Sequence, residues 1–280
     1  MAAELESVEE LDADEREALE ALLFRLADDE FVLAERYTEW QVRAPTLESD
    51  LALANNAQDE LGHARLWYDV LEDLGYEEHE LVYERPPDEW RHATVVERPI
   101  PEGGWDDTIV RHYLYDVAEE LRLEALADSR YVPIADRVGK IQAEESYHVE
   151  HAQNWMERLA GGEGKERLED AVNELFPHAL TLFVPVSPAL EEAIVDAGFR
   201  TRSLEELAEE WLSIVVPFLE GLDLEVPVPE DGEITDADLP DELGRDGTHT
   251  DAWEDLYEDF THTYRELGRS EATTIMDEPA

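Results

Sequence analysis

The chain of 280 residues has no cysteine and only two lysines, Lys140 and Lys165. The lack of cysteine excludes disulfide bonds, thiolate metal sites and cysteine nucleophiles, so any bound metal must take oxygen and imidazole nitrogen ligands. It also fits an intracellular protein, and we expect a cytoplasmic location. No run of about 18 apolar residues is present, which argues against a transmembrane helix. The acidic stretch from Glu4 to Glu20 is typical of neither a signal peptide nor a transit peptide.

Positive charge is scarce throughout the chain. Only 21 residues are basic against 73 acidic residues, and the net charge is −52. Repulsion between so many like charges needs screening by salt, which indicates the cytoplasm of a halophile. Nucleic acids and anionic membranes are bound through basic patches, so neither is expected as a partner.

Apolar residues recur at helical spacing in four long segments, at about 14–42, 47–74, 106–129 and 133–159. Thr46 is placed to cap the second of these helices, and Gly75 ends it. A long connector at 76–105, rich in proline, glycine and charge, separates the second helix from the third. Four helices with one long connection predict an all-α, ferritin-like four-helix bundle. We assign this bundle to residues 14–183, with a fifth helix at about 165–183.

The remainder of the chain has a different character. A short helix is expected after Ser187, another begins at the capping box from Ser203 to Glu206, and a last helix covers 251–267. Residues 223–250 between them are rich in proline, aspartate, glutamate and glycine. We therefore predict a C-terminal helical extension at 184–268 that packs on the bundle, and a disordered tail at 269–280. No β-strand is predicted.

Three Glu-x-x-His pairs occur in the sequence. Glu60/His63 and Glu145/His148 lie inside long helical segments, where a spacing of three places both side chains on one face. The pair Glu89/His92 follows two prolines and has no sustained apolar periodicity, so we interpret it as a chance match at the surface. Two facing Glu-x-x-His helices, with one acid from each of two further helices, are the ligand pattern of carboxylate-bridged dinuclear bundles.

The other two helices also carry candidate inward-facing acids. Glu30 shares a face with Leu26 and Leu33, where a carboxylate is costly unless it is paired or binds a metal. The third helix offers four acids, which are Asp116, Glu119, Glu120 and Glu124. Asp116 precedes Glu145 by 29 residues, close to the 30 that separate Glu30 from Glu60, whereas Glu119 and Glu120 match less well. The predicted ligands are therefore Glu30, Glu60, His63, Asp116, Glu145 and His148.

These six oxygen and nitrogen ligands suit a di-iron centre, with manganese as an alternative. A chain so rich in acid also places stray carboxylates beside apolar positions without binding metal, and that interpretation stays open here. No catalytic residue beyond the metal ligands is evident. We interpret five aromatic residues as part of the core: Trp40, Trp67, Tyr68, Tyr113 and Tyr147. We interpret four histidines as surface groups or neighbours of the ligands: His112, His151, His249 and His262.

Three segments of the sequence are similar to a known family. These are Arg43-Ala44-Pro45-Thr46-Leu47, Gln58-Asp59-Glu60-Leu61-Gly62-His63 and Glu144-Glu145-Ser146-Tyr147-His148. They resemble the large helical subunits of the bacterial phenylacetyl-CoA epoxidases, the phenylacetic acid catabolic A/C family, over about residues 15–268. That family pairs a catalytic A-type subunit, which holds the di-iron site, with a homologous C-type subunit that is typically a scaffold.

The resemblance points to a C-type subunit that has kept a complete ligand set. Segments typical of the C type are Arg25-Leu26-Ala27-Asp28, Asn55-Asn56-Ala57, Ala64-Arg65-Leu66, Thr108-Ile109-Val110-Arg111 and Gly247-Thr248-His249-Thr250. The six predicted ligands match the catalytic A type, whose third-helix ligand resembles an aspartate.

The resemblance implies an O2-dependent monooxygenase that adds one oxygen atom across the aromatic ring of phenylacetyl-CoA. The implied partners are a catalytic A-type subunit and a flavin and iron–sulfur reductase. One alternative is a non-catalytic scaffold of that complex, whose 76–105 connector and C-terminal helices would form the subunit interface. Another is a ferritin-like metal-storage protein, which needs no C-terminal extension.

The binding place of the CoA thioester stays open between this chain and its partner. Its phosphates require basic side chains, and the candidates are Arg43, Arg65, Arg91, Arg98 and Arg111. A cluster of these arginines beside the acids would favour binding on this chain, whereas a scattered arrangement would favour the partner.

Overall fold

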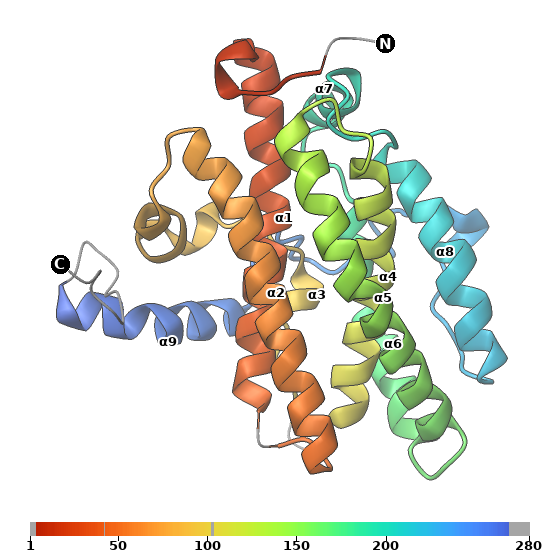
Figure 1. Cartoon of the computed structure of the whole chain (residues 1–280). Coiled ribbons are helices and arrows are strands. Elements are labelled where there is room, and N and C mark those ends of the chain that lie inside the picture. Colours follow the sequence, from red (N-terminus) through yellow and green to blue (C-terminus); the bar gives the residue numbers. More distant parts are fainter. Residues whose placement is uncertain (1–3, 42, 102–103, 269–280) are drawn as a thin grey trace.

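The computed structural model describes residues 4–41, 43–101 and 104–268. Within these ranges every regular element is a helix, and the only β-type contact is an isolated bridge between Leu5 and Tyr131. Four long helices form the bundle (Figure 1): α1 (Ala13–Trp40), α2 (Leu47–Asp73), α4 (Trp105–Leu126) and α5 (Val132–Ala160). The prediction of an all-α bundle is confirmed.

Local sequence signals explain where the bundle helices begin. The Asp12 side chain accepts hydrogen bonds from the backbone N–H groups of Asp14 and Glu15 at the start of α1. Thr46 accepts a hydrogen bond from the Ser49 N–H at the start of α2, as predicted. The end of α4 at Leu126 lies three residues before the expected end at 129. Position 42, where the first helix was expected to end, lies outside the described residues.

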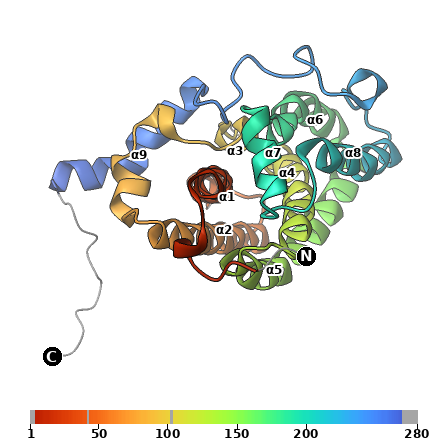
Figure 2. The same ribbon diagram turned by 90° about the horizontal axis from the view of Figure 1, so that it is seen from above.

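The two helical hairpins α1–α2 and α4–α5 are the main packing units of the bundle. Helix α2 also contacts α5, and the views in Figures 1 and 2 agree that these two helices lie side by side on one face of the molecule. Viewed from above, α1 lies in the middle of the fold, with other elements around it. Its buried residues include charged ones, Asp28, Asp29 and Glu30, in consecutive positions.

The 76–105 connector is more deeply packed than its composition indicated. It contains a π-helix (Glu80–Glu84), a 3-10 helix (Pro87–Glu89) and the short helix α3 (Thr94–Glu97), of which all four residues are buried. The Trp90 and His92 side chains are completely buried. The interpretation of Glu89/His92 as a surface match is correct for Glu89, which is exposed, and wrong for His92.

The later helices cover the bundle from several sides. Helix α6 (Lys165–Leu180) and α8 (Leu204–Gly221) pack on α4, whereas α7 (Pro188–Asp196) and α9 (Asp251–Leu267) pack on α1. Three 3-10 helices complete the described structure, at Val8–Glu10, Thr181–Phe183 and Glu230–Gly232. The tail expected to be disordered at 269–280 lies outside the described residues.

No single helix in the described ranges has the length and apolar character needed to cross a membrane. Only the bent pair Lys165–Phe183 and Pro188–Asp196, with 62° between its parts, reaches that composition when the two are taken together. The first of these helices buries Leu168, Val172 and Leu175 in the core of this chain.

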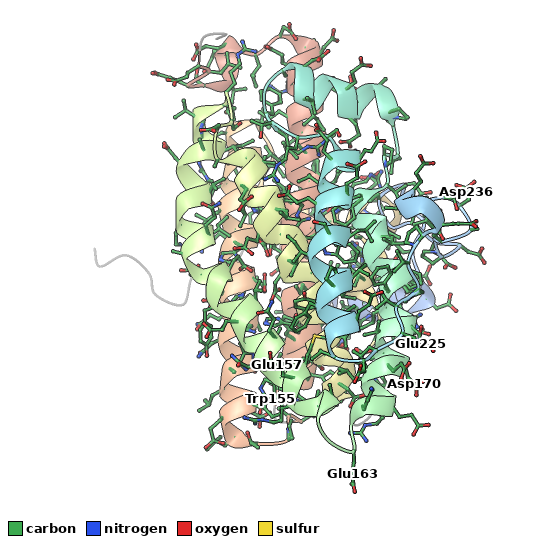
Figure 3. All side chains as sticks on the ribbon, turned by 90° about the vertical axis from the view of Figure 1, so that its right-hand side faces the viewer. Trp155, Glu157, Glu163, Asp170, Glu225 and Asp236 are labelled. Carbon is green, nitrogen blue, oxygen red and sulfur yellow. The ribbon has the colours of Figure 1, made fainter. Side chains whose placement is uncertain are left out.

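The surface carries the excess of negative charge. Figure 3 shows Glu163, Asp170, Glu225 and Asp236 projecting outward from one side of the molecule, and each is exposed. Exposed carboxylates at this density repel one another unless salt screens them, as the composition indicated.

Candidate metal centre

Seven buried side chains from the four bundle helices meet inside the fold. They are Glu30 of α1, Glu60 and His63 of α2, Asp116 and Glu119 of α4, and Glu145 and His148 of α5, and none is more than 1% exposed. Their ligand atoms form three overlapping groups, in each of which all atoms lie within 4.8 Å of one another: Glu30/Glu60/His63, Glu60/Asp116/His148 and His63/Glu119/Glu145. We call these seven residues the acid cage.

All six predicted ligands lie in the acid cage, and Glu119 joins them. Asp116 and Glu119 are three residues apart on α4, so both side chains point to the same face of that helix. Spacing along the chain favours Asp116 over Glu119, but helix geometry allows both acids to face inward. The cage therefore has five carboxylates and two imidazoles.

The two histidines are held in the same way by reciprocal contacts between α2 and α5. His63 presents Nδ1 to the cage, 3.4 Å from Glu145, while its Nε2 lies 2.8 Å from the Glu144 carboxylate. His148 presents Nδ1 to the cage, 3.2 Å from Glu145, while its Nε2 lies 3.4 Å from the Asp59 carboxylate.

This arrangement fixes which nitrogen each ring offers to a metal. A carboxylate that accepts the Nε2–H leaves the lone pair on Nδ1, and metal-binding histidines commonly have such an outer carboxylate. Asp59 and Glu144 were not predicted as functional residues. Their signal in the sequence is an acid directly before the glutamate of each Glu-x-x-His pair in the long helices.

Most of the ligand atoms that face the cage lack a hydrogen-bond partner among the described residues. Among the described residues, both carboxylate oxygens of Glu60, Asp116, Glu119 and Glu145 are buried without a hydrogen bond. The Nδ1 atoms of both cage histidines are also buried without one. Buried polar atoms are nearly always paired, so this many unpaired atoms in one place calls for a ligand. Oxygen and imidazole donors in this arrangement fit a pair of divalent transition-metal ions.

The electrostatics of the cage also indicate that it binds cations. Burial, followed by repulsion from neighbouring carboxylates, raises the pKa of each of the five cage acids well above its ordinary value. Burial lowers the pKa of His63 and of His148, so both rings are held neutral, as a metal ligand must be. Five carboxylates that resist ionisation next to one another are stabilised as anions when cations lie between them.

His112 extends the cage on one side. Its Nε2 lies 3.2 Å from the Asp116 carboxylate and 2.9 Å from the Asn56 side-chain nitrogen, and its Nδ1 lies 2.9 Å from the Tyr37 hydroxyl. Burial and the nearby His148 and His151 lower the pKa of His112 well below its ordinary value. Its position beside a ligand agrees with the interpretation made from the sequence, although it is buried rather than exposed.

A network of buried ion pairs surrounds the two residues that precede Glu30 on α1. Asp29 accepts hydrogen bonds from Arg122 at 2.6 Å, from Arg245 at 2.7 Å and from the Ala93 N–H at 2.8 Å. Asp28 is paired with Arg85 and accepts a hydrogen bond from the Tyr68 hydroxyl. Consecutive acids on α1 therefore tie the connector and the C-terminal segment to the helix that carries Glu30.

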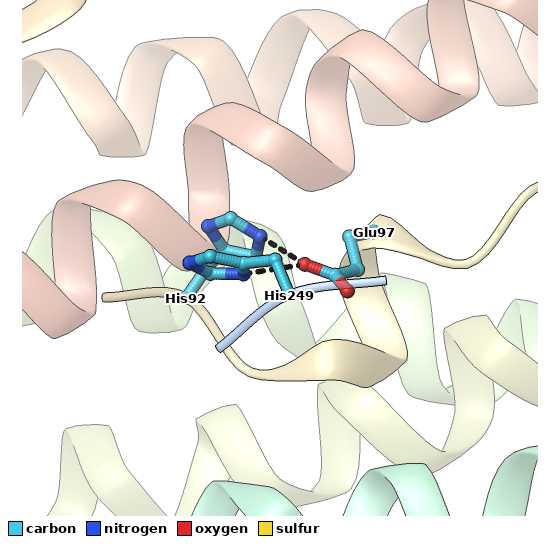
Figure 4. Close-up of side chains that lie close together, drawn as sticks. All are labelled: His92, Glu97 and His249. Atoms are coloured by element: carbon cyan, nitrogen blue, oxygen red, sulfur yellow. Dashed lines mark hydrogen bonds and ion pairs between the residues drawn. The ribbon is translucent and has the colours of Figure 1, made fainter. Parts of the chain in front are cut away.

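A second group of histidines and a carboxylate lies outside the cage (Figure 4). Glu97 Oε2 faces His92 Nε2 at 2.6 Å and His249 Nδ1 at 2.7 Å, and Glu97 Oε1 accepts the Thr250 N–H at 2.7 Å. The other nitrogen of His249 lies 3.2 Å from the Trp90 carbonyl oxygen, which can only accept a hydrogen bond. His249 thus bridges the Glu97 carboxylate and the backbone at Trp90.

This second group fastens the start of α9 to α3 and does not favour a metal. The His92 Nδ1 atom is buried without a partner among the described residues, whereas a ligating ring needs a partner for its second nitrogen. Burial alone would raise the pKa of Glu97, but hydrogen bonds from His249 and His92 hold it well below its ordinary value. Burial and the neighbouring His249 lower the pKa of His92 to about 4, so its ring is neutral.

Four of the five aromatic residues assigned to the core are buried there: Trp40, Trp67, Tyr68 and Tyr113. The assignment is wrong for Tyr147, which is 60% exposed. Tyr147 directly precedes the buried His148 in the sequence. Consecutive residues of a helix point about 100° apart, so Tyr147 faces solvent although His148 faces the cage.

Comparison with known proteins identifies the family. The model of the family described as "Phenylacetic acid catabolic protein" matches residues 1–270. The chain belongs to this family. Two members from Escherichia coli (strain K12) are similar to it in sequence. The C component of 1,2-phenylacetyl-CoA epoxidase is 34% identical over 169 residues, which cover 59% of this chain and 67% of that component.

The second relative is the A component of the same epoxidase. It is 28% identical over 195 residues, which cover 68% of this chain and 62% of that component. This member of the phenylacetic acid catabolic family is thus related to both components. The matched segments span about two thirds of the length of each relative.

Proposed function

We propose that this chain is a C-type component of a phenylacetyl-CoA epoxidase that holds two metal ions in its acid cage. Family membership and the similarity to the C component of the Escherichia coli enzyme support its place in such a complex. The observation that carries the metal-binding part is the convergence of five carboxylates and two imidazoles without internal partners. A scaffold that had lost its metal would be expected to fill this space with apolar side chains, because buried unpaired acids are costly.

The residues of the cage have separate roles in this proposal. Glu30, Glu60, His63, Asp116, Glu145 and His148 hold the metal ions, with Glu119 as a further carboxylate ligand from α4. Asp59 and Glu144 keep the metal-binding nitrogens of the histidines free of protons. The surrounding core excludes water from the ligands. A pair of iron ions held there would supply redox chemistry toward O2, with the electrons delivered by the reductase, and manganese is the alternative metal.

The arrangement of the arginines supports a CoA thioester site on the partner rather than on this chain. The five candidates are scattered. Arg111 is buried and paired with Asp107, and Arg98 is paired with Glu174. Arg43 lies over the Trp40 ring, and Arg65 is exposed on α2. Arg91 donates to backbone carbonyls at the edge of a cavity of about 760 Å³.

Three other arginines line that cavity, and each already has an acid partner. Arg25 is paired with Glu191, Arg85 with Asp28, and Arg245 with Asp29. Phosphate groups would have to compete with these carboxylates for the same guanidinium groups. We therefore propose that the A-type subunit binds phenylacetyl-CoA, and that a flavin and iron–sulfur reductase supplies electrons in the cytoplasm of a halophile.

The test is reconstitution of the complex from this chain, its A-type partner and the reductase in concentrated salt. Replacement of Glu60 and Glu145 by glutamine in this chain alone is expected to lower O2-dependent consumption of phenylacetyl-CoA by about 100-fold or more, because metal ligands are lost. Glu157→Gln, an exposed acid on α5, is the matched control and should leave the rate unchanged. Full activity of the double variant would show that this chain is a scaffold.

A further inference from the structure

The cavity of about 760 Å³ lies where four segments of the chain meet. It is lined by α1 between positions 21 and 25, by the connector between positions 76 and 91, by the start of α7, and by Arg245. None of the residues that line it belongs to the acid cage. Pockets that bind small molecules have volumes of about 300–1,000 Å³. The cavity is therefore a candidate binding site separate from the metal centre.

The interior wall of the cavity is basic. Its four basic side chains are buried or half-buried: Arg25, Arg85, Arg91 and Arg245. Its three acidic side chains are all exposed: Glu80, Glu84 and Glu89. Salt screens exposed charges much more than buried ones. Ser187, the N-cap residue of α7, also lines the cavity, and the N-terminus of a helix carries partial positive charge.

The buried acids behind this wall are outnumbered by the arginines that they serve. Two of these acids each form ion pairs with two arginines: Glu191 with Arg25 and Arg200, and Asp29 with Arg245 and Arg122. Asp28 is paired with Arg85. Arg91 forms no ion pair among the described residues and donates to backbone carbonyls. These six arginines thus have three buried carboxylates between them as ion-pair partners.

Arg25 has hydrogen-bond donors left for a ligand. Its Nη1 donates to Glu191, whereas its Nε and Nη2 have no hydrogen-bond partner among the described residues. Neither of these two atoms is among those buried from solvent, although Arg25 as a whole is only 9% exposed. They are therefore open towards the cavity that Arg25 lines.

The charge around Arg25 also favours an anion. Burial, followed by repulsion from Arg245 and Arg200, lowers the pKa of Arg25 to about 9. An anion beside the guanidinium would offset that repulsion and accept the free N–H groups.

The other side chains of the cavity are largely apolar. Phe24 of α1 and Tyr76 of the connector meet edge to face, with 5.3 Å between their ring centroids. Leu81, Val186 and Leu190 line the cavity beside them. A ligand that matches both parts of the wall has one anionic group and an apolar body.

We propose that this cavity binds a small organic carboxylate with an aromatic or aliphatic body, whose carboxylate group lies at Arg25 and Arg91. Guanidinium groups hold carboxylates through paired N–H donors. The exposed acids of the cavity disfavour a molecule with several negative charges, which agrees with a CoA thioester site on the partner. A single carboxylate can use the free donors of Arg25 without displacing Glu191. The inference does not depend on metal binding in the acid cage.

The test is titration calorimetry of the whole chain with sodium phenylacetate in concentrated salt. The neutral amide 2-phenylacetamide has nearly the same shape and is expected to bind about 10-fold more weakly or worse, because a hydrogen-bonded ion pair is lost. Sodium hexanoate is compared with phenylacetate at the same salt concentration. The tighter binder of the two identifies the body as aliphatic or aromatic.

Two substitutions locate the site. Arg25→Gln removes the free donors, and Leu190→Glu places an acid in the apolar wall; each is expected to weaken phenylacetate binding by about 10-fold or more. Leu190 is half-buried, so its variant keeps the test valid if Arg25→Gln does not fold. Arg98→Gln is the matched control, because Arg98 is paired with Glu174 outside the cavity, and it should bind like the unaltered chain. Circular dichroism establishes that each variant is folded.

Hydrogen exchange gives a second readout of the location. Phenylacetate is expected to slow exchange within 76–91. Protection confined to 56–63 and 112–148 would place the carboxylate on the metal ligands instead and would overturn the inference. Equal affinity for phenylacetate and its amide would also overturn it, as would phenylacetate binding that both folded cavity variants leave unchanged. The same holds if the unaltered chain binds neither carboxylate.

Discussion

Glu60→Gln is expected to stabilise the metal-free protein and to destabilise the metal-loaded protein. Without metal, the Glu60 carboxylate is buried among other carboxylates and repelled by Glu145. A neutral amide of the same shape relieves that repulsion, and we expect a gain of about 1–3 kcal/mol in the free energy of unfolding. With metal bound, the same change removes a ligand, and we expect a loss of about 3 kcal/mol or more.

The stability of the metal-free protein should also depend on pH in a defined direction. The pKa of the cage glutamates is raised above the ordinary value of 4.5, so above pH 4.5 the folded protein holds protons that the unfolded chain has released. Stability is then lost as the pH rises from about 4.5 towards the raised values, by about 1.4 kcal/mol per pH unit for each proton concerned. Bound metal replaces those protons and should flatten this dependence.

Urea denaturation in concentrated salt, with and without a chelator, measures both effects. Glu157→Gln is the control, because this acid on α5 is exposed and should change stability by less than about 0.5 kcal/mol in either state. Equal effects of Glu60→Gln in the two states would mean that no metal interacts with Glu60.

Asp29→Ala should be among the most destabilising single substitutions in the chain. It leaves the guanidinium groups of Arg122 and Arg245 buried without their shared carboxylate and removes the acceptor of the Ala93 N–H. Loss of one partner from a buried ion pair costs about 3–5 kcal/mol, because the remaining charge stays buried. For a chain of this size, that corresponds to a fall of about 10 °C or more in the melting temperature.

Thermal denaturation in concentrated salt checks this expectation. Asp14→Ala, an exposed acid in the first turn of the same helix, should cost less than about 1 kcal/mol. A melting temperature for Asp29→Ala close to that of Asp14→Ala would show that the network contributes little to stability.

Much of the fold follows from local patterns in the sequence. The apolar periodicity, the capping residues Asp12, Thr46 and Ser203, and the glycine after α2 define helices whose ends are within about three residues of those observed. The Glu-x-x-His spacing placed four side chains on the inward faces of α2 and α5, because residues three apart share a helix face.

The remainder depends on contacts between distant segments, which no local pattern specifies. Spacing compares positions along the chain, so it could not show that Asp116 and Glu119 both reach the cage from α4. The burial of His92 depends on Glu97 and on His249, a residue 157 positions later in the chain. The roles of Asp28 and Asp29 likewise depend on arginines from three separate segments.

The most direct measurement of the central claim is the metal content of the chain purified alone in concentrated salt. Elemental analysis of the unaltered protein is expected to give about two iron or manganese ions per chain. A Glu60→Ala/His148→Ala variant that keeps its helical content should lose them. A folded, unaltered protein that holds no metal, even after anaerobic incubation with ferrous iron, would contradict the account and leave the acid cage without a function.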